Sequence, residues 1–485
     1  MNFLFLFPDE MCAGSLSCYG NKYSHTPNID KLAEESTLFK NCFVQNPVCS
    51  PSRCSLMTGT YVHNRGHRTL WHLLQPDEPS LFRYLKKSGY NIQWYGKNDL
   101  YSQAYLDEIC DDINEKREES NSFTRNLDKT KNHFSPGEPG YYSFWYEDVH
   151  SEEIPLDEDI KKAISFLKNY KEEDPPFFLY LPLDLPHPPY WAYDVFHKLY
   201  RPEQLTAELS VPVPSKPSFE ALIRKYRNLD NLSMESFAEI YSIYLAGCSY
   251  VDYLWGKLDQ ILKETGLSKN TVILFASDHG DWHGTRKLVE KWPNAMDEEI
   301  IHVPLIIRMP GGIKGHIVNE PNELFDIMAT VLDLAGIQPQ HTHFSHSLIP
   351  QLLGNPGDPN RLVFCEGGYD ITEPHCFEGY PKRESVNSSN AIANIYHPKQ
   401  LQQQLQPESV CRTVMIRNAS YKLVRRSTGA HELYDLKNDP EEIYNLYFNE
   451  AAKIVRLELE SALLDWYLHT SDTVPFKEDN RNFGS

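Results

Sequence analysis

The sequence lacks an excess of basic residues and any apolar run long enough to cross a membrane. Its 485 residues include 47 Lys and Arg against 67 Asp and Glu, which gives a formal net charge of −20. Nucleic-acid binding needs a basic surface, so this charge argues against a nucleic-acid partner. No apolar stretch approaches the ~20 residues of a membrane-spanning helix, so we expect no membrane partner either.

Paired cysteines are also missing. The ten cysteines form no C-x-x-C motif and no regular framework, so we expect reduced thiols rather than disulfides. The apolar start at residues 2–7 has no basic leader and runs directly into Pro8. We therefore expect a cytoplasmic protein, although a chain trimmed of its leader would look the same.

Strand-like and helix-like segments alternate along the first two thirds of the chain. The apolar runs that predict strands cover residues 3–7, 92–95, 177–181, 272–276 and 303–307, and the helical patterns cover 159–170, 234–265 and 323–335. This alternation predicts an α/β fold with a large, mostly parallel sheet sandwiched by helices. Functional residues in such folds gather at the carboxyl ends of the strands.

Two segments interrupt the alternation of strands and helices, and after about residue 355 the predicted strands become shorter. Residues 101–155 and 190–235 read as long insertions, which often shape a substrate cleft. Short strands at 362–365, 413–417 and 421–424 and a final helix at 451–467 indicate a smaller α+β subdomain. We predict a catalytic domain of residues 1–355 and a C-terminal subdomain of residues 356–485.

The strongest motif is C-x-P-x-R at residues 49–53, followed by Thr58-Gly59. Ser50 can cap a helix whose first position is Pro51. Cys49 would then lie just before a helix N-terminus, where free N–H groups and the helix dipole favour an anion. Arg53, one turn along, can reach back to a negatively charged nucleophile. The alternative is a buried structural cysteine at a helix start.

Acidic side chains follow two of the predicted strands. Asp9 and Glu10 come directly after the first strand, and Asp278 and His279 follow the strand at 272–276. Taken singly, each carboxylate could be a solvated or capping residue. Together at two strand ends they favour a metal site, and oxygen ligands of this kind suit a hard cation such as Ca²⁺ or Mg²⁺.

Three basic side chains occupy comparable positions. Lys97 follows the strand at 92–95, His187 lies between prolines after the strand at 177–181, and Lys291 precedes the strand at 303–307. A histidine in such a place can protonate a leaving alcohol. Without the other motifs, a surface lysine or a loop histidine would explain each of them.

From residue 2 to about 446, these motifs resemble the formylglycine-dependent sulfatases of the alkaline phosphatase superfamily. The resemblance implies an alkaline phosphatase/sulfatase-like fold and a sulfatase that hydrolyses a sulfate ester. It implies that a formylglycine-generating or anaerobic sulfatase-maturing enzyme oxidises Cys49, and that the hydrated aldehyde is the nucleophile. It further implies one divalent metal, expected to be Ca²⁺ with Mg²⁺ or Mn²⁺ as alternatives. The implied catalytic residues are Cys49, Arg53, Lys97, His187 and Lys291, and the implied metal ligands are Asp9, Glu10, Cys49, Asp278 and His279.

The chain departs from the family pattern after Gly96-Lys97, where Asn98 and Asp99 replace the usual Trp and His. The resulting G-K-x-D faintly resembles sulfatases that act on uronic-acid sulfates of glycosaminoglycans. We therefore expect a carbohydrate O-sulfate on a sugar or short oligosaccharide, with arylsulfatase activity on model substrates. The candidate substrate-binding residues are Asn64, His67, Arg68 and Asp99, with Trp71 and His72 as further candidates.

Other functions remain open on the sequence. A phosphonate monoester hydrolase or phosphodiesterase of the same superfamily would share the fold, the formylglycine and the metal. A non-catalytic pseudoenzyme would keep the fold without turnover. A phosphomutase or alkaline phosphatase would instead use Ser or Thr as nucleophile and carry more metal ligands than this chain shows.

Overall fold

A twisted central sheet organises the molecule, for which the computed structural model describes residues 1–113, 153–370, 372–373 and 396–476. Within these residues, eight strands form one sheet in the order β4-β3-β5-β1-β6-β7-β2-β8. Neighbouring strands are parallel except at β7, which runs antiparallel to β6 and β2. The predicted large, mostly parallel sheet is therefore confirmed. The strands are β1 (Asn2–Asp9), β2 (Thr37–Phe43), β3 (Asn91–Trp94), β4 (Asp112–Ile113), β5 (Phe177–Pro186), β6 (Thr271–Ala276), β7 (His302–Arg308) and β8 (His316–Glu323).

The phenylalanine-rich strand β1 lies in the middle of this sheet. Phe3 stands opposite Phe178 of β5 on one side and Val272 of β6 on the other. The side chains of residues 3–7 are fully buried, because helices cover both faces of the sheet. A strand with no solvated face has no need of polar alternation, which explains the continuous apolar run in the sequence.

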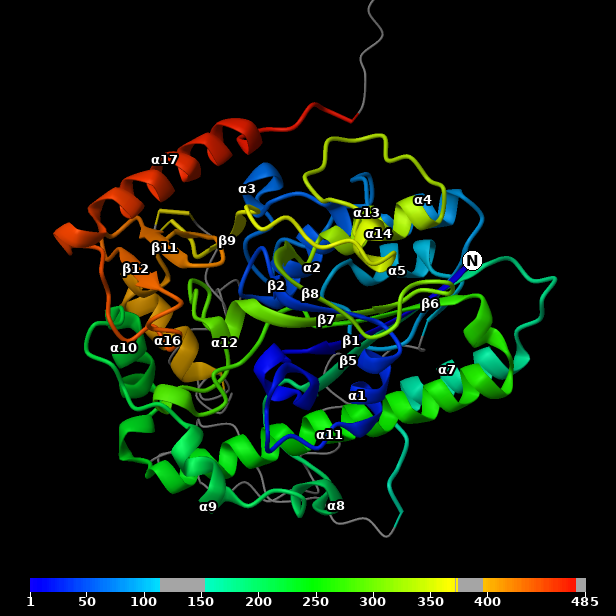
Figure 1. The fold of residues 1–485 in the computed structure, drawn as a ribbon, viewed down its shortest axis with the longest axis horizontal. Helices are drawn as coiled ribbons and strands as arrows, with labels where there is room; N and C mark the ends of the chain where they lie inside the picture. The colour runs from blue at the N-terminus through cyan, green and yellow to red at the C-terminus, as the bar shows by residue number, and fades with distance from the viewer. Residues whose placement is uncertain (114–152, 371, 374–395, 477–485) are drawn as a thin grey trace, which may run out of the picture.

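Helices form a layer on each side of the sheet, as Figure 1 shows. The long helix α11 (Met234–Glu264) lies on one side with α1 (Pro27–Glu34) and α7 (Glu158–Asn169). The other side carries α2 (Cys49–Thr58), α4 (Leu81–Lys87) and α13 (Asp326–Leu334). The helix predicted from residue 323 begins three residues later, because β8 continues to Glu323.

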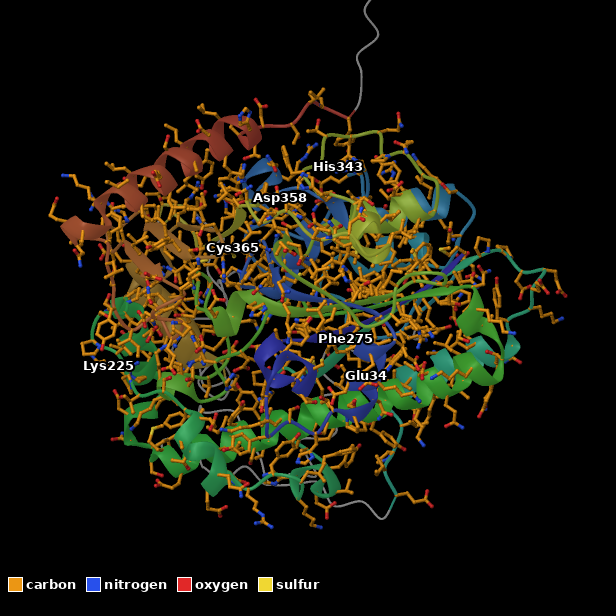
Figure 2. The ribbon with its side chains drawn as sticks, in the orientation of Figure 1. Glu34, Lys225, Phe275, His343, Asp358 and Cys365 are labelled. Carbon is orange, nitrogen blue, oxygen red and sulfur yellow. The ribbon has the colours of Figure 1, made fainter. Side chains whose placement is uncertain are left out.

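Figure 2 shows how densely side chains fill the space between these layers. Phe275 of β6 is fully buried, whereas Glu34 and Lys225 lie on the exterior. Within the described part of the chain, no helix is long and apolar enough to span a membrane.

A smaller antiparallel sheet follows in sequence. Among the described residues it has four strands in the order β12-β11-β10-β9, formed by β9 (Val363–Gly367), β10 (Thr413–Arg417), β11 (Tyr421–Arg426) and β12 (Glu432–Asp435). Helices α16 (His397–Leu405) and α17 (Lys453–Thr470) accompany it, which confirms the predicted α+β unit. The exact boundary at residue 355 stays a prediction.

Short helices fill the connections. Residues 114–152 of the first predicted insertion lie outside the described residues, and the second contains α8, α9 and α10. The shorter helices are α3 (Val62–Arg65), α5 (Gln103–Ile109), α8 (Asp194–His197), α9 (Pro202–Leu205), α10 (Ser218–Tyr226), α12 (Glu298–Ile301) and α14 (Ile349–Leu352). Because β1, β3, β5 and β6 are parallel, their carboxyl ends meet at one edge of the sheet, where the candidate site is found.

Candidate active site

Cys49 is the first residue of α2 and lies at the centre of the site. The C-x-P-x-R motif predicted that Cys49 lies just before the helix and that Ser50 caps it. The structure corrects this, because the extended residue Val48 precedes the helix and Ser50 lies in its first turn. All ten residues of α2 are buried, so the N–H groups of its first turn face the interior. Burial, with the nearby charge of Asp9, raises the pKa of the Cys49 thiol well above its usual value.

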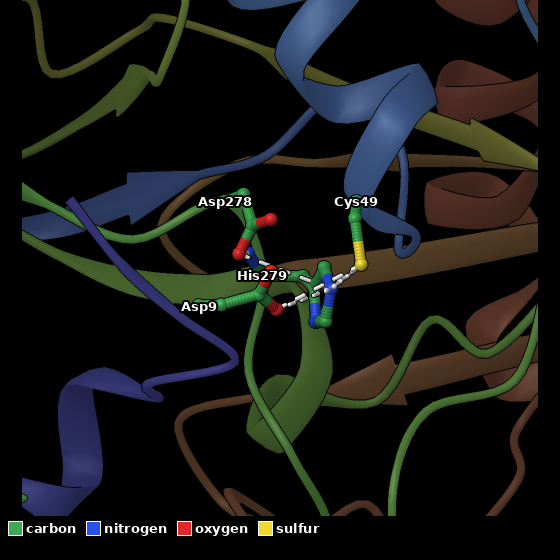
Figure 3. Close-up of side chains that lie close together, drawn as sticks. All are labelled: Asp9, Cys49, Asp278 and His279. Carbon is green, nitrogen blue, oxygen red and sulfur yellow. Dashed lines mark hydrogen bonds and ion pairs between the residues drawn. The ribbon is translucent and has the colours of Figure 1, made fainter. Parts of the chain in front are cut away.

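The four side chains of Asp9, Cys49, Asp278 and His279 converge in a fully enclosed cluster (Figure 3). Cys49 Sγ lies 3.1 Å from His279 Nε2 and 3.7 Å from Asp9 Oδ1. One potential ligand atom from each residue lies within 4.8 Å of the others. The structure thus brings together residues 9, 49, 278 and 279, which come from three distant parts of the sequence.

Arg53 connects the two carboxylates of this cluster. Its Nη2 lies 2.8 Å from Asp9 Oδ2, and its Nε donates to Asp278 Oδ2 at 2.8 Å. Burial disfavours the charged form of Asp9, but Lys97, His187 and Arg53 outweigh it and hold the pKa of Asp9 well below its usual range. Asp9 is therefore a carboxylate at neutral pH. The arginine contacts the predicted metal ligands, and its charge compensates them.

Glu10 has a backbone conformation that fits a ligand position. Its φ of +68° is in the left-handed region, and its N–H donates to Asp278 Oδ1 at 3.2 Å. Its Oε2 accepts a hydrogen bond from Lys291 at 2.9 Å, whereas its Oε1 is buried with no hydrogen-bond partner among the described residues. A buried carboxylate oxygen without a donor fits a bound cation. Together with Asp9 and Asp278, it makes an oxygen-rich site suited to a hard divalent ion.

Lys97 approaches the cluster from the end of β3. Its Nζ lies 2.6 Å from Asp9 Oδ2 and 2.9 Å from Asp99 Oδ2. The preceding Gly96 has φ +137°, and a Cβ there would lie 2.1 Å from the carbonyl oxygen of Pro182. Only glycine permits this close approach to β5. Asp99, one of the predicted substrate-binding residues, therefore lies beside Lys97 at the site.

His187 and Lys291 form a second group around the carboxylate of Glu10. Lys291 Nζ lies 2.8 Å from His187 Nε2, and His187 Nδ1 donates to the Pro188 carbonyl oxygen at 2.5 Å. Burial and the two lysines lower the pKa of His187 well below its usual value, whereas the neighbouring acidic groups outweigh burial and raise the pKa of Lys291. Lys291 therefore donates to a neutral imidazole. His187, Lys291 and Glu10 meet within hydrogen-bonding distance.

The other predicted substrate-binding residues have different partners. Asn64 contacts Tyr61 and Thr470, and His67 contacts the His72 carbonyl and Glu78. Arg68 pairs with Glu373 at 2.6 Å. Of the two further candidates, Trp71 is largely exposed and His72 contacts Thr69. Their role in substrate binding stays a prediction.

Two supporting residues were not identified from the sequence. Ser52 Oγ donates to the Asp278 carbonyl at 2.6 Å and so ties α2 to the end of β6. Tyr244 of α11 donates to the Glu10 carbonyl at 2.9 Å and accepts from Cys12 N–H at 3.0 Å. The position of Ser52 inside C-x-P-x-R is a usable signal. Tyr244 gives none, because it is one of many aromatic residues on α11.

The Sulfatase family model matches residues 1–337. The chain belongs to the sulfatase family. The uncharacterized sulfatase YidJ of Escherichia coli (strain K12) is 26% identical over 489 residues, covering 96% of this chain and 86% of that protein. Members of this family hydrolyse sulfuric esters and generally use a metal ion and formylglycine, which agrees with the cluster around Cys49.

Two solved structures share the fold. The phosphonate monoester hydrolase of Agrobacterium radiobacter has a TM-score of 0.75 at 22% identity, covering 97% of this sulfatase and 96% of that chain. A protein solved in complex with its substrate D-glucosamine-2-N,6-O-disulfate has a TM-score of 0.70 at 21% identity, covering 99% of both chains. The alkaline phosphatase/sulfatase-like fold expected from the sequence is confirmed.

Proposed function

We propose that this sulfatase hydrolyses a carbohydrate O-sulfate through a formylglycine derived from Cys49. The observation that carries the proposal is the convergence of three cationic side chains, Arg53, Lys97 and Lys291, around the buried start of α2. These cations lie among the carboxylates of Asp9, Glu10 and Asp278, and a divalent ion held by those carboxylates would leave an excess of positive charge there, in a chain whose net charge is −20. A cluster of cations at a helix N-terminus favours a tetrahedral oxyanion such as a sulfate group.

The reaction consumes one water: R–O–SO₃⁻ and H₂O give R–OH and HSO₄⁻. A formylglycine at position 49 would supply a hydrated aldehyde as the nucleophile: one hydroxyl would displace R–OH from sulfur, and the other would expel the sulfate as the aldehyde is regenerated and takes up water again. A divalent ion, expected to be Ca²⁺, would supply charge neutralisation when held by Asp9, Glu10, Asp278, His279 and the side chain of residue 49.

The basic side chains around the metal ligands have separate roles in this proposal. Arg53 compensates Asp9 and Asp278 and keeps both carboxylates in place. Lys97 lies where it can hold a sulfate oxygen. His187 and Lys291 hold a proton between Nε2 and Nζ, 2.8 Å apart, and can deliver it to the leaving alcohol oxygen.

A small sulfated sugar is the substrate class that the site supports best. Asp99, paired with Lys97, provides a carboxylate that can accept a hydrogen bond from a sugar hydroxyl beside the sulfate. The complex of a structural relative with a sulfated glucosamine agrees with this class. The second candidate is phosphonate monoester hydrolysis, which the structural likeness to the Agrobacterium radiobacter enzyme favours.

Peptide mass spectrometry across Cys49, on protein co-expressed with a maturing enzyme, tests the mechanism. We expect a loss of about 18 Da at Cys49 and a sulfate-ester turnover that follows the converted fraction. Cys49→Ala should abolish turnover. The matched control is Cys54→Ala on the same buried helix, which should retain it.

The same samples separate the alternatives. Faster turnover of a phosphonate monoester than of aryl and sugar sulfates would replace the proposed activity with the second candidate. Unmodified Cys49 in the presence of a competent maturing enzyme, with no turnover of either ester, would indicate a pseudoenzyme.

A further inference from the structure

A second cluster of buried charged side chains adjoins the site at Lys291. The Glu290 carboxylate accepts hydrogen bonds from Arg227 Nη2 at 2.7 Å and from Lys399 Nζ at 2.8 Å. Its Oε1 lies 3.8 Å from Lys291 Nζ. Arg227, Glu290, Lys291 and Lys399 are each at most 2% exposed. One carboxylate thus faces three cations that come from three separate parts of the chain.

The carboxylate of Glu290 lies near the ammonium group of the residue that directly follows it, and the backbone at Glu290 is unusual. Successive residues of an extended chain point to opposite sides. Glu290 instead has φ +65°, in the left-handed region, which costs a non-glycine residue on the order of 1 kcal/mol or more. Its N–H donates to the hydroxyl of Tyr190 at 2.9 Å, which helps to maintain this conformation. Strain of this kind in a buried segment indicates a constraint on the neighbouring residue.

The contacts of Lys291 show what that constraint is. Its Nζ contacts Glu10 and His187, the residues of the candidate site, at 2.9 and 2.8 Å. It also lies near Glu290, whose carboxylate is held by the two cations Arg227 and Lys399. Without the Glu290 charge, no carboxylate of that residue would offset the repulsion of Lys291 by Arg227 and Lys399. The lysine would then be drawn toward Glu10 and repelled by Lys399.

We propose that Glu290 is a positioning residue, anchored by Arg227 and Lys399, that sets where Lys291 presents its ammonium group to the substrate. The inference rests on the proposed function, in which Lys291 acts on the leaving group. It extends that site to helix α16, because Lys399 belongs to α16. It also includes the segment after α10, which supplies Arg227.

The test compares Glu290→Gln with the wild type as converted, calcium-loaded enzyme. We expect kcat for an aryl sulfate to fall by about 10- to 100-fold, because a misplaced catalytic group costs rate. KM should stay within about 3-fold and calcium affinity within about 2-fold, since Glu290 is not among the metal ligands. Glu290→Asp keeps the charge but shortens the side chain, so its kcat should lie between those of the wild type and Glu290→Gln.

The matched control is Glu432→Gln. Glu432 is a buried carboxylate bound to Arg426 at 2.7 and 2.9 Å in the C-terminal sheet. It should lose stability as Glu290→Gln does while kcat stays within about 2-fold of wild type. If Glu290→Gln does not fold, Lys399→Gln removes one anchor and should lower kcat in the same direction by a smaller factor. An unchanged kcat in the folded Glu290 or Lys399 variant, or an equal fall in Glu432→Gln, would overturn the proposal.

A binding measurement separates this inference from the proposed function. Inorganic sulfate is titrated into the calcium-loaded proteins with unconverted Cys49. Glu290→Gln should bind sulfate about 2- to 3-fold more weakly than the wild type, within the change expected for KM, and Glu432→Gln should bind it as well as the wild type does. If the wild type hydrolyses neither sulfate nor phosphonate esters, the proposed function fails. Equal sulfate binding by the wild type and Glu290→Gln would count against the positioning role even then.

Discussion

Replacing Arg53 with methionine tests whether the candidate metal site is balanced by this arginine. Methionine keeps most of the unbranched stem but is two atoms shorter and carries no charge. Arg53 is 1% exposed and lies 2.8 Å from both Asp9 and Asp278, which are fully buried. Its removal would leave two buried carboxylates short of compensation.

The size of the effect follows from these contacts. Removing one partner of a buried ion pair typically costs about 3–5 kcal/mol. Asp9 keeps Lys97 at 2.6 Å, and Asp278 keeps the N–H groups of His279 and Glu10 at 3.0 and 3.2 Å. We therefore expect a loss near the lower end, about 3 kcal/mol, in the free energy of unfolding measured by urea titration in EDTA.

Calcium should then offset part of the loss. An ion present at 100 times its dissociation constant stabilises the folded state by about 2.7 kcal/mol. If the ion binds between Asp9 and Asp278, it should stabilise Arg53→Met at least as much as the wild type, because it replaces the missing positive charge. The control is Arg426→Met, which removes another buried arginine with an acidic partner. Calcium should stabilise this variant no more than it stabilises the wild type. A loss below about 1 kcal/mol in EDTA would refute the reasoning, as would a smaller calcium effect in Arg53→Met than in the wild type.

Two further changes give distinct expectations. Asp278→Asn removes a ligand charge at the end of β6, so calcium affinity measured by titration calorimetry should fall by at least about 10-fold together with activity; retained affinity would remove Asp278 from the ligand set. Asp252 is buried on α11, and burial, opposed by hydrogen bonds from Ile29 and Asn28, raises its pKa from 3.8 to about 7. The folded state therefore binds a proton that the unfolded state releases, and the free energy of unfolding should decrease as the pH rises from about 4 to about 7. Asp252→Asn should flatten that decrease in urea titrations across this window, and an unchanged slope would contradict the assignment.

The central strands could be predicted because they are buried on both faces. Residues 3–7, 177–181 and 272–276 are apolar without interruption, and each lies within an observed strand. β2 and β8 were not predicted. β8 is an edge strand that includes polar residues and Pro321, and β2 has Lys40 and Asn41 in its middle. Strands with a polar pattern of this kind have no distinctive sequence signal.

The site was predictable to the extent that its residues follow strands or belong to a spaced motif. Asp9 and Asp278 lie at strand ends and Cys49 belongs to the spaced motif, and the structure places all three together. The contact of Glu290 with Lys399 joins residues 109 positions apart. No spacing or periodicity links two such positions, so only the folded chain shows that they meet.

The central place of β1 has a consequence for how the protein is made. Its partners Phe178 and Val272 lie about a third and more than half of the way along the chain. At about 5–20 residues per second, a ribosome needs roughly 15–50 s after completing β1 to add β6. Until β5 has been added, residues 3–7, five consecutive apolar side chains, have no native strand on either side, and until β6 has been added they have one on only one side. The central strand of the sheet is therefore completed long before both of its partners exist, and we expect it to be a part of the nascent chain that needs protection from aggregation.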